Sequence, residues 1–226
     1  MKVDSEDFSE QWTDTLSIRI RIQLRLPSDP EGYQSSDEES EGTERSSLPL
    51  PAGAFTRCSA ASLMALRNLP PEAPLVLLTP FLVPAALSDS APDEPHRRDP
   101  FEDLGRQLAL RHPNISHVPY VPSIGFTDTH AGFVMNSEAV ITVICEPGHA
   151  LKRDSMREQH QFAEAALKAF NSRAMTMPGD GEIVLVQCAT DEARRRAHCA
   201  FANVIETVFY NEDLAAYLAR NIFGRD

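Results

Sequence analysis

One short stretch of the sequence brings together residue types that can move a proton. Gly125-Phe126-Thr127-Asp128-Thr129-His130 places a carboxylate two residues before an imidazole. Such a pair can act as an acid–base dyad, because the carboxylate orients the ring and raises its basicity. The alternative, which the pattern favours, is a helix start in which Thr127 or Asp128 caps free N–H groups. The first interpretation makes Asp128 and His130 a candidate catalytic dyad.

The cysteines and the other histidines form no recognisable metal motif. The four cysteines are far apart in the sequence, and no two histidines have H-x₃-H spacing. His198-Cys199 together with Cys188 comes nearest to a ligand set, and we expect no metal. In a chain without an export signal, the cysteines are interpreted as reduced thiols that pack like small apolar groups.

Motifs for phosphate-bearing cofactors and for serine hydrolases are also missing from the sequence. The first apolar run is followed by Thr79-Pro80-Phe81-Leu82-Val83-Pro84, where a dinucleotide-binding domain has G-x-G-x-x-G. Without those glycines the backbone cannot approach a pyrophosphate closely. The chain has no G-K-[ST] phosphate loop and no G-x-S-x-G elbow. We therefore expect no cofactor.

Apolar runs and cap residues predict the elements that would position these side chains. Strands are expected at 75–80, 117–121, 139–145, 182–188 and 203–210. Helices are expected at 60–68, from Asp99-Pro100 onward, and at 129–137, 157–172, 191–201 and 211–224. This alternation predicts a three-layer α/β/α sandwich with a mostly parallel, doubly wound sheet of about five strands.

The loops after the predicted strands supply a candidate ligand-binding rim. Ligands of doubly wound sheets bind outside the carboxyl ends of the strands, where the strand order reverses. The polar loop residues that this rule selects are Thr79, Ser123, Thr127, Asp128, Glu146, Asp191 and Asn211. Glu146 could also act as a lone acid, although such a carboxylate is more often simply solvated.

The N-terminal part of the chain differs in composition from the rest. Residues 1–50 hold 12 acidic and 5 basic side chains, which is more than half of the net charge of −12. Residues 1–26 contain the alternating stretch Leu16–Leu26, which predicts one strand. Its basic outward stripe is interpreted as a solvated edge, with a nucleic-acid face as the alternative. Residues 27–54, rich in Ser, acidic residues and Pro, predict a disordered linker before a sandwich domain at 55–226.

The composition favours a globular chain that binds neither nucleic acid nor membranes. Hydrophobic residues make up 42% and charged residues 24%, close to ordinary globular values. An acidic chain without a clustered basic face is poorly suited to phosphate backbones or anionic lipid surfaces. The start shows no secretory leader, and no run of ~18 apolar residues occurs. A cytoplasmic location is therefore expected.

The predicted sandwich carries a series of short motifs in a fixed order. They are residues 61–68, the run 75–80 that ends in Thr-Pro, residues 139–144, 159–162 and 182–187, and residues 207–224 with a closing Phe-Gly. This series resembles the C-terminal α/β sandwich domain of glycoside hydrolase family 3, in particular that of fungal β-N-acetylglucosaminidase-type members. The resemblance covers about residues 55–225.

The resemblance implies a role as well as a fold. In that family the nucleophilic aspartate lies on a preceding (β/α)₈ barrel of ~250 residues, whereas about 50 residues precede the sandwich here. No family role transfers to Asp128 or His130, and Cys188–Asp191 departs from the Arg-x-Pro-Tyr-like turn that members often have. The chain is therefore expected to be a stand-alone or truncated relative without independent glycosidase activity, with a sugar ligand or a catalytic barrel as its partner.

Two alternatives remain open. The first is an enzyme that hydrolyses O-glycosyl bonds with a barrel that comes from another chain or was lost through truncation of the gene model. The second is a flavodoxin-like domain that binds a small molecule and resembles the family by convergence.

Overall fold

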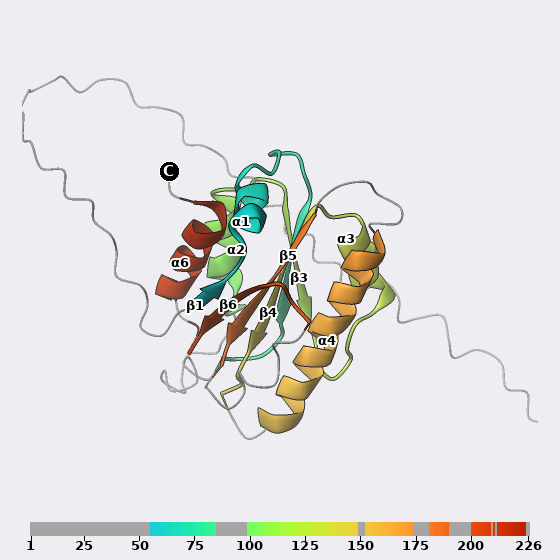
Figure 1. The fold of residues 1–226 in the computed structure, drawn as a ribbon. Coiled ribbons are helices and arrows are strands. Elements are labelled where there is room, and N and C mark those ends of the chain that lie inside the picture. Colours follow the sequence, from blue (N-terminus) through green and yellow to red (C-terminus); the bar gives the residue numbers. More distant parts are fainter. Residues whose placement is uncertain are drawn as a thin grey trace, which may run out of the picture. The chain divides into compact units, whose positions relative to one another are not determined.

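A six-stranded sheet with helices on both faces makes up the described structure (Figure 1). The structure is a computed structural model that describes residues 55–84, 99–148, 152–173, 181–189, 200–208, 210 and 212–224. The strands follow the order β1-β6-β5-β4-β2-β3 across the sheet. Their bounds are Phe55–Arg57 (β1), Leu75–Pro80 (β2), Ile115–Tyr120 (β3), Ala139–Cys145 (β4), Glu182–Cys188 (β5) and Asn203–Thr207 (β6).

The five predicted strands are confirmed, and they run parallel to one another. Strands β2 and β4 are buried along their whole length, as expected of apolar runs that are covered on both faces. Strand β6 ends at Thr207, earlier than predicted, where the Thr207 carbonyl accepts a hydrogen bond from the Ala189 N–H at 2.9 Å. Strand β1, which the sequence analysis missed, pairs antiparallel with β6 over three residues and is too short to show a period.

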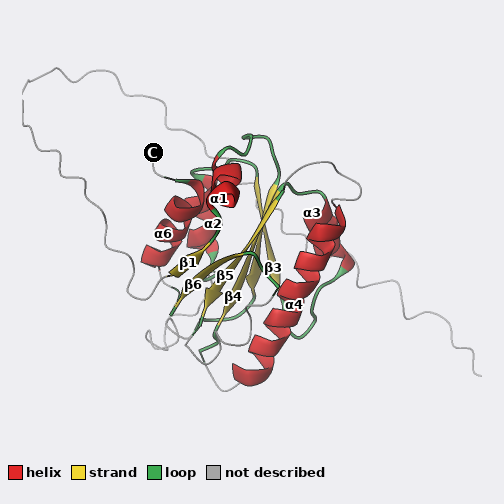
Figure 2. Ribbon diagram, viewed as in Figure 1, coloured by secondary structure: helices red, strands yellow, loops and turns green. Residues whose placement is uncertain are grey.

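Two groups of helices cover the two faces of the sheet (Figure 2). One group consists of α1 (Ala60–Arg67), α2 (Glu102–Ala109) and α6 (Glu212–Phe223). The other consists of α3 (Asp128–Met135) and α4 (Lys152–Arg173). Alternate residues of a strand point to opposite faces, so Leu77 packs in the first core and Val76 in the second. The predicted three-layer α/β/α sandwich with a mostly parallel, doubly wound sheet is therefore the fold.

The helix bounds differ from the prediction at one important point. Helix α4 begins at Lys152, five residues before the predicted start, and its first turns bury Met156 and Gln159. The predicted helix at 191–201 lies almost wholly outside the described residues, as do the strand in 1–26 and the linker at 27–54. None of the described helices combines the length and hydropathy that a membrane crossing requires.

The order of the parallel strands decides where a ligand crevice would be expected. When the five parallel strands, β2 to β6, are renumbered 1 to 5 along the chain, their order across the sheet is 2-1-3-4-5. This is the flavodoxin-like order. The strand order therefore reverses between β2 and β4. The carboxyl ends of these two strands are the first place to look for a site.

Candidate functional site

Two side chains fill the position where β2 and β4 separate. The last paired residues of these strands are Leu78 and Thr142, so the later backbone groups of β4 lack a strand partner on that side. The Tyr120 hydroxyl donates to the Val143 carbonyl at 2.9 Å. The amide of Gln159 accepts from the N–H of Cys145 at 2.8 Å and donates to its carbonyl at 3.0 Å. Protein groups thus occupy the reversal point of the sheet.

The loops that follow β2 and β4 also contact each other through backbone groups at the same edge of the sheet. The Gly148 N–H donates to the Val83 carbonyl at 3.0 Å, and Pro84 and Pro147 form an isolated antiparallel bridge. The backbone amide of Glu146 continues the ladder by donating to the Cys188 carbonyl at 2.8 Å. These contacts leave the described loops bonded to one another at the place where a doubly wound domain usually holds its ligand.

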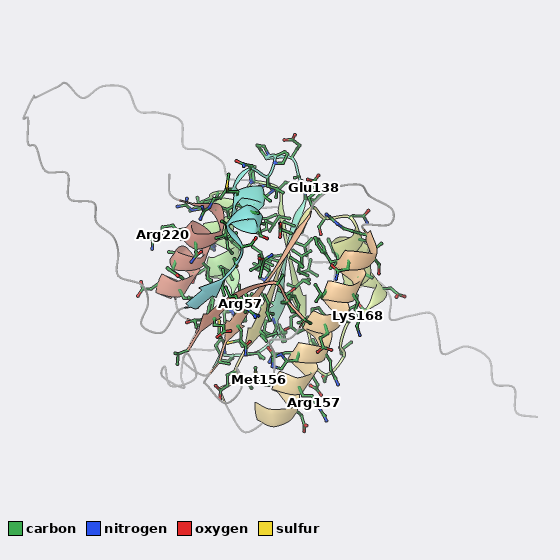
Figure 3. All side chains as sticks on the ribbon, in the orientation of Figure 1. Arg57, Glu138, Met156, Arg157, Lys168 and Arg220 are labelled. Atoms are coloured by element: carbon green, nitrogen blue, oxygen red, sulfur yellow. The ribbon has the colours of Figure 1, made fainter. Side chains whose placement is uncertain are left out.

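An open groove of about 590 Å³ lies beside this closed edge, between the loop that follows β3 and helix α4. Its loop wall consists of Pro122, Ser123, Ile124, Gly125 and Phe126, and its helix wall of Arg157, Glu158, Gln161, Phe162 and Ala165. Gly125 has a φ of 76°, a conformation that favours glycine and lets the loop turn toward α3. In Figure 3, Arg157 lies beside Met156 at one end of α4, and Lys168 lies further along the same helix.

The predicted rim residues are spread over different surroundings. Ser123 lines the groove, and Thr127 and Asp128 follow its loop wall at the start of α3. Thr79 is buried in the sheet, and Glu146 is half-buried after β4. Asp191 and Asn211 lie outside the described residues. Of the described rim residues, Ser123 is the one that lines the groove.

His130 serves as a helix cap in this structure. Its Nδ1 accepts the Thr127 N–H at 3.1 Å and lies 2.8 Å from the Thr127 hydroxyl, so the two residues form a capping box. Burial lowers the pKa of His130, while the Pro119 carbonyl acts in the opposite direction. Asp128 is exposed, and no hydrogen bond among the described residues joins it to His130. The catalytic dyad stays a prediction.

A second set of polar groups lies on the other face of the sheet. The Thr79 hydroxyl is 2.7 Å from Nε2 of His117, and the Asp99 carboxylate is 3.6 Å from the same nitrogen. Burial lowers the pKa of His117, although Asp99 and Glu102 act to raise it. A catalytic triad needs the carboxylate on the other ring nitrogen and an accessible hydroxyl. Thr79 is 0% exposed and the carboxylate lies nearest the same ring nitrogen as the hydroxyl, so this set meets neither requirement.

Cys145 and Cys188 face one another across β4 and β5 as buried free thiols. A hydrogen bond with Cys188 and burial raise the pKa of the Cys145 thiol well above its ordinary value, which keeps it protonated. Within the described ranges, no group of three or more His, Cys, Asp or Glu side chains is placed to hold a metal ion.

The sequence analysis missed Gln159 and Tyr120 as determinants of the site. A signal for Gln159 exists, because it falls on the buried stripe of α4 that includes Phe162, Ala163 and Ala166. A polar residue inside an apolar stripe needs a hydrogen-bonding partner. The sequence carries no sign that this partner is the backbone of Cys145.

The strand order and the two helical layers define a doubly wound α/β domain. Comparison with known proteins adds a structural likeness. No family model matches the chain, and no curated protein matches it. A solved structure described as "A unique GCN5-related glucosamine N-acetyltransferase region exist in the fungal multi-domain GH3 beta-N-acetylglucosaminidase" is similar, with a TM-score of 0.52 and 13% identity. The likeness covers 76% of this chain and 16% of that one, so it concerns a small part of a much longer protein. At this identity it shows the fold alone.

Proposed function

We propose that residues 55–226 act as an accessory α/β domain of the type that accompanies the catalytic barrel in glycoside hydrolase family 3. The domain serves carbohydrate chemistry and has no glycosidase activity of its own. The observation that carries this proposal is the structural likeness to part of a fungal multi-domain GH3 β-N-acetylglucosaminidase. The order of motifs from residue 61 to Gly224 supports the same assignment.

The chemistry of the groove supports a domain that depends on a partner for catalysis. Most glycosidases place two carboxyl groups about 5–10 Å apart around the scissile bond. Glu158 is the sole carboxylate among the residues that line the described groove. The other candidate carboxylate, Asp128, is exposed at the start of α3. A catalytic barrel is therefore the partner that this proposal requires.

The direct test is an activity assay on the purified chain with a chromogenic N-acetylglucosaminide. We expect product release no faster than in the buffer blank, with the wild type and Asp128→Ala indistinguishable. Turnover that is lost in Asp128→Ala would overturn the proposal and establish the Asp128/His130 dyad. An in-frame barrel with a catalytic aspartate in the neighbouring genomic DNA would instead favour the alternative of an active two-part hydrolase.

The strand order favours a second candidate, a flavodoxin-like domain that binds a small molecule at the reversal point. The contacts of Tyr120 and Gln159 with β4 argue against it, because they occupy that point. Titration with flavin mononucleotide separates the two candidates. Saturable quenching of flavin fluorescence would favour the second candidate, and a flat response supports the accessory domain.

A further inference from the structure

We propose that the groove between residues 122–126 and α4 binds a short, neutral oligosaccharide of two or more linked rings. This inference rests on the proposed function and assigns a ligand class to the groove. The volume of about 590 Å³ lies within the ~300–1,000 Å³ that is usual for ligand sites. The groove lies at the carboxyl edge of the sheet, directly after β3.

Apolar groups form one part of the groove. Ala165 of α4 and the half-buried Phe126 of the loop line it, while Phe162, which is 1% exposed, packs against Phe126. Ile124 is 68% exposed at its rim, although it is a large apolar side chain. The C–H face of a pyranose ring packs on surfaces of this kind, since aromatic and aliphatic carbon both gain from the removal of water.

Polar side chains without a partner among the described residues form the other part. The side chains of Ser123, Glu158 and Gln161 make no hydrogen bond or ion pair with any other described residue. Together they offer a hydroxyl, a carboxylate and an amide, which can accept and donate hydrogen bonds. The hydroxyl groups around a sugar ring require this mixture of donors and acceptors beside an apolar surface.

The charges in the groove favour a neutral ligand. Among the described residues that line the groove, Arg157 is the only cationic one, and it is 3.2 Å from Asp154 in an exposed ion pair. The neighbouring Glu158 supplies a negative charge in the groove itself. A phosphate or a strongly acidic ligand would meet this carboxylate without a matching cluster of cations. An uncharged sugar avoids this repulsion.

The walls are held in place by packing beneath the groove. The rings of Tyr120 and Phe162 are stacked with centroids 3.6 Å apart, and Phe126 meets Phe162 edge-on at 5.4 Å. Gln159, which lies between the lining residues Glu158 and Gln161 in the sequence, ties α4 to β4. A groove with rigid walls loses little conformational entropy when a ligand binds.

The test is a calorimetric titration of the full chain with di-N-acetylchitobiose. We expect saturable binding, and a loss of about fivefold in affinity in Gln161→Ala, the effect of one neutral hydrogen bond. Asn171→Ala is the matched control, since Asn171 is an exposed amide on the same helix outside the groove. It should bind as the wild type does.

The outcomes separate this inference from the proposed function. No saturable heat at millimolar disaccharide, or equal affinities of Gln161→Ala and wild type, overturns the groove assignment and leaves the inactive accessory domain intact. Binding of inorganic phosphate but not of the disaccharide also overturns it. Glycosidase turnover by the chain would overturn the proposed function, while the affinity difference between the two variants still tests the groove.

Discussion

The side-chain amide of Gln159 hydrogen-bonds both the N–H and the carbonyl of Cys145, at 2.8 and 3.0 Å. Beyond Thr142, β4 is no longer paired with β2. Gln159 of α4 therefore forms the backbone hydrogen bonds with Cys145 that β2 forms with earlier residues of β4. Gln159 is itself 0% exposed. This contact and that of Tyr120 fill the reversal point of the sheet, and the groove along α4 lies beside it.

Replacing Gln159 by leucine should lower the free energy of unfolding by about 3 kcal/mol, because two buried backbone groups of Cys145 lose their partner. Urea denaturation followed by circular dichroism measures this change. Glu164→Gln, an exposed position on the same helix, should stay within about 0.5 kcal/mol of the wild type. Equal losses in the two variants would show that the amide contact does not stabilise the sheet.

Tyr120→Phe isolates the second contact at the reversal point. The variant removes the hydroxyl that donates to Val143, while the ring can keep its stacking on Phe162. We expect a loss of about 1 kcal/mol in the free energy of unfolding. Tyr120 and Gln159 bind adjacent parts of β4, so the double variant Tyr120→Phe/Gln159→Leu should depart from additivity. Strict additivity in the denaturation cycle would show that the contacts are independent.

Two glycine-to-alanine substitutions should have opposite effects on stability. A Cβ at Gly181 would overlap the Arg173 guanidinium and lie 2.7 Å from the backbone oxygen of Glu138. Gly181→Ala should therefore cost about 1–3 kcal/mol. A Cβ at Gly132, in helix α3, meets no atom within 4 Å, and Gly132→Ala should add about 0.5–1 kcal/mol. Thermal melts of both variants test the pair, and a shift of the same sign in both would contradict it.

Acidification should destabilise the domain through His117 and His130. Burial lowers the pKa of both imidazoles in the folded protein, whereas an unfolded histidine keeps a pKa of about 6.5. The unfolded state therefore binds more protons once the pH falls below about 6.5, and the free energy of unfolding decreases down to the folded-state pKa values.

His117→Asn tests this pH dependence with a side chain that does not titrate. The variant should lose less stability than the wild type when the pH is lowered from about 7.5 to about 5.5. Urea denaturation at the two pH values gives the comparison. A slope unchanged by the substitution would show that His117 takes no part in the acid response.

Local patterns in the sequence were enough to predict the fold class. Uninterrupted apolar runs such as 139–145 require cover on both faces, and their alternation with amphipathic helices leads to a layered parallel sheet. The end of α6 could also be predicted from the sequence, because Gly224 adopts a φ of 87° that other residues rarely take. Burial and backbone conformation at these positions depend on residues nearby in the sequence. A short stretch of sequence is therefore enough to predict them.

Contacts between distant residues were decided by the tertiary structure. Thr79 was expected at a ligand rim, yet it pairs with His117, 38 residues away, inside the protein. Residue spacing could not show that Ser123 and Gln161 share a groove. Such contacts depend on which strands become neighbours, and strand order follows from the packing of the whole sheet. A periodic pattern in the sequence indicates that one face of an element is buried. Which element packs on that face is decided by the tertiary structure.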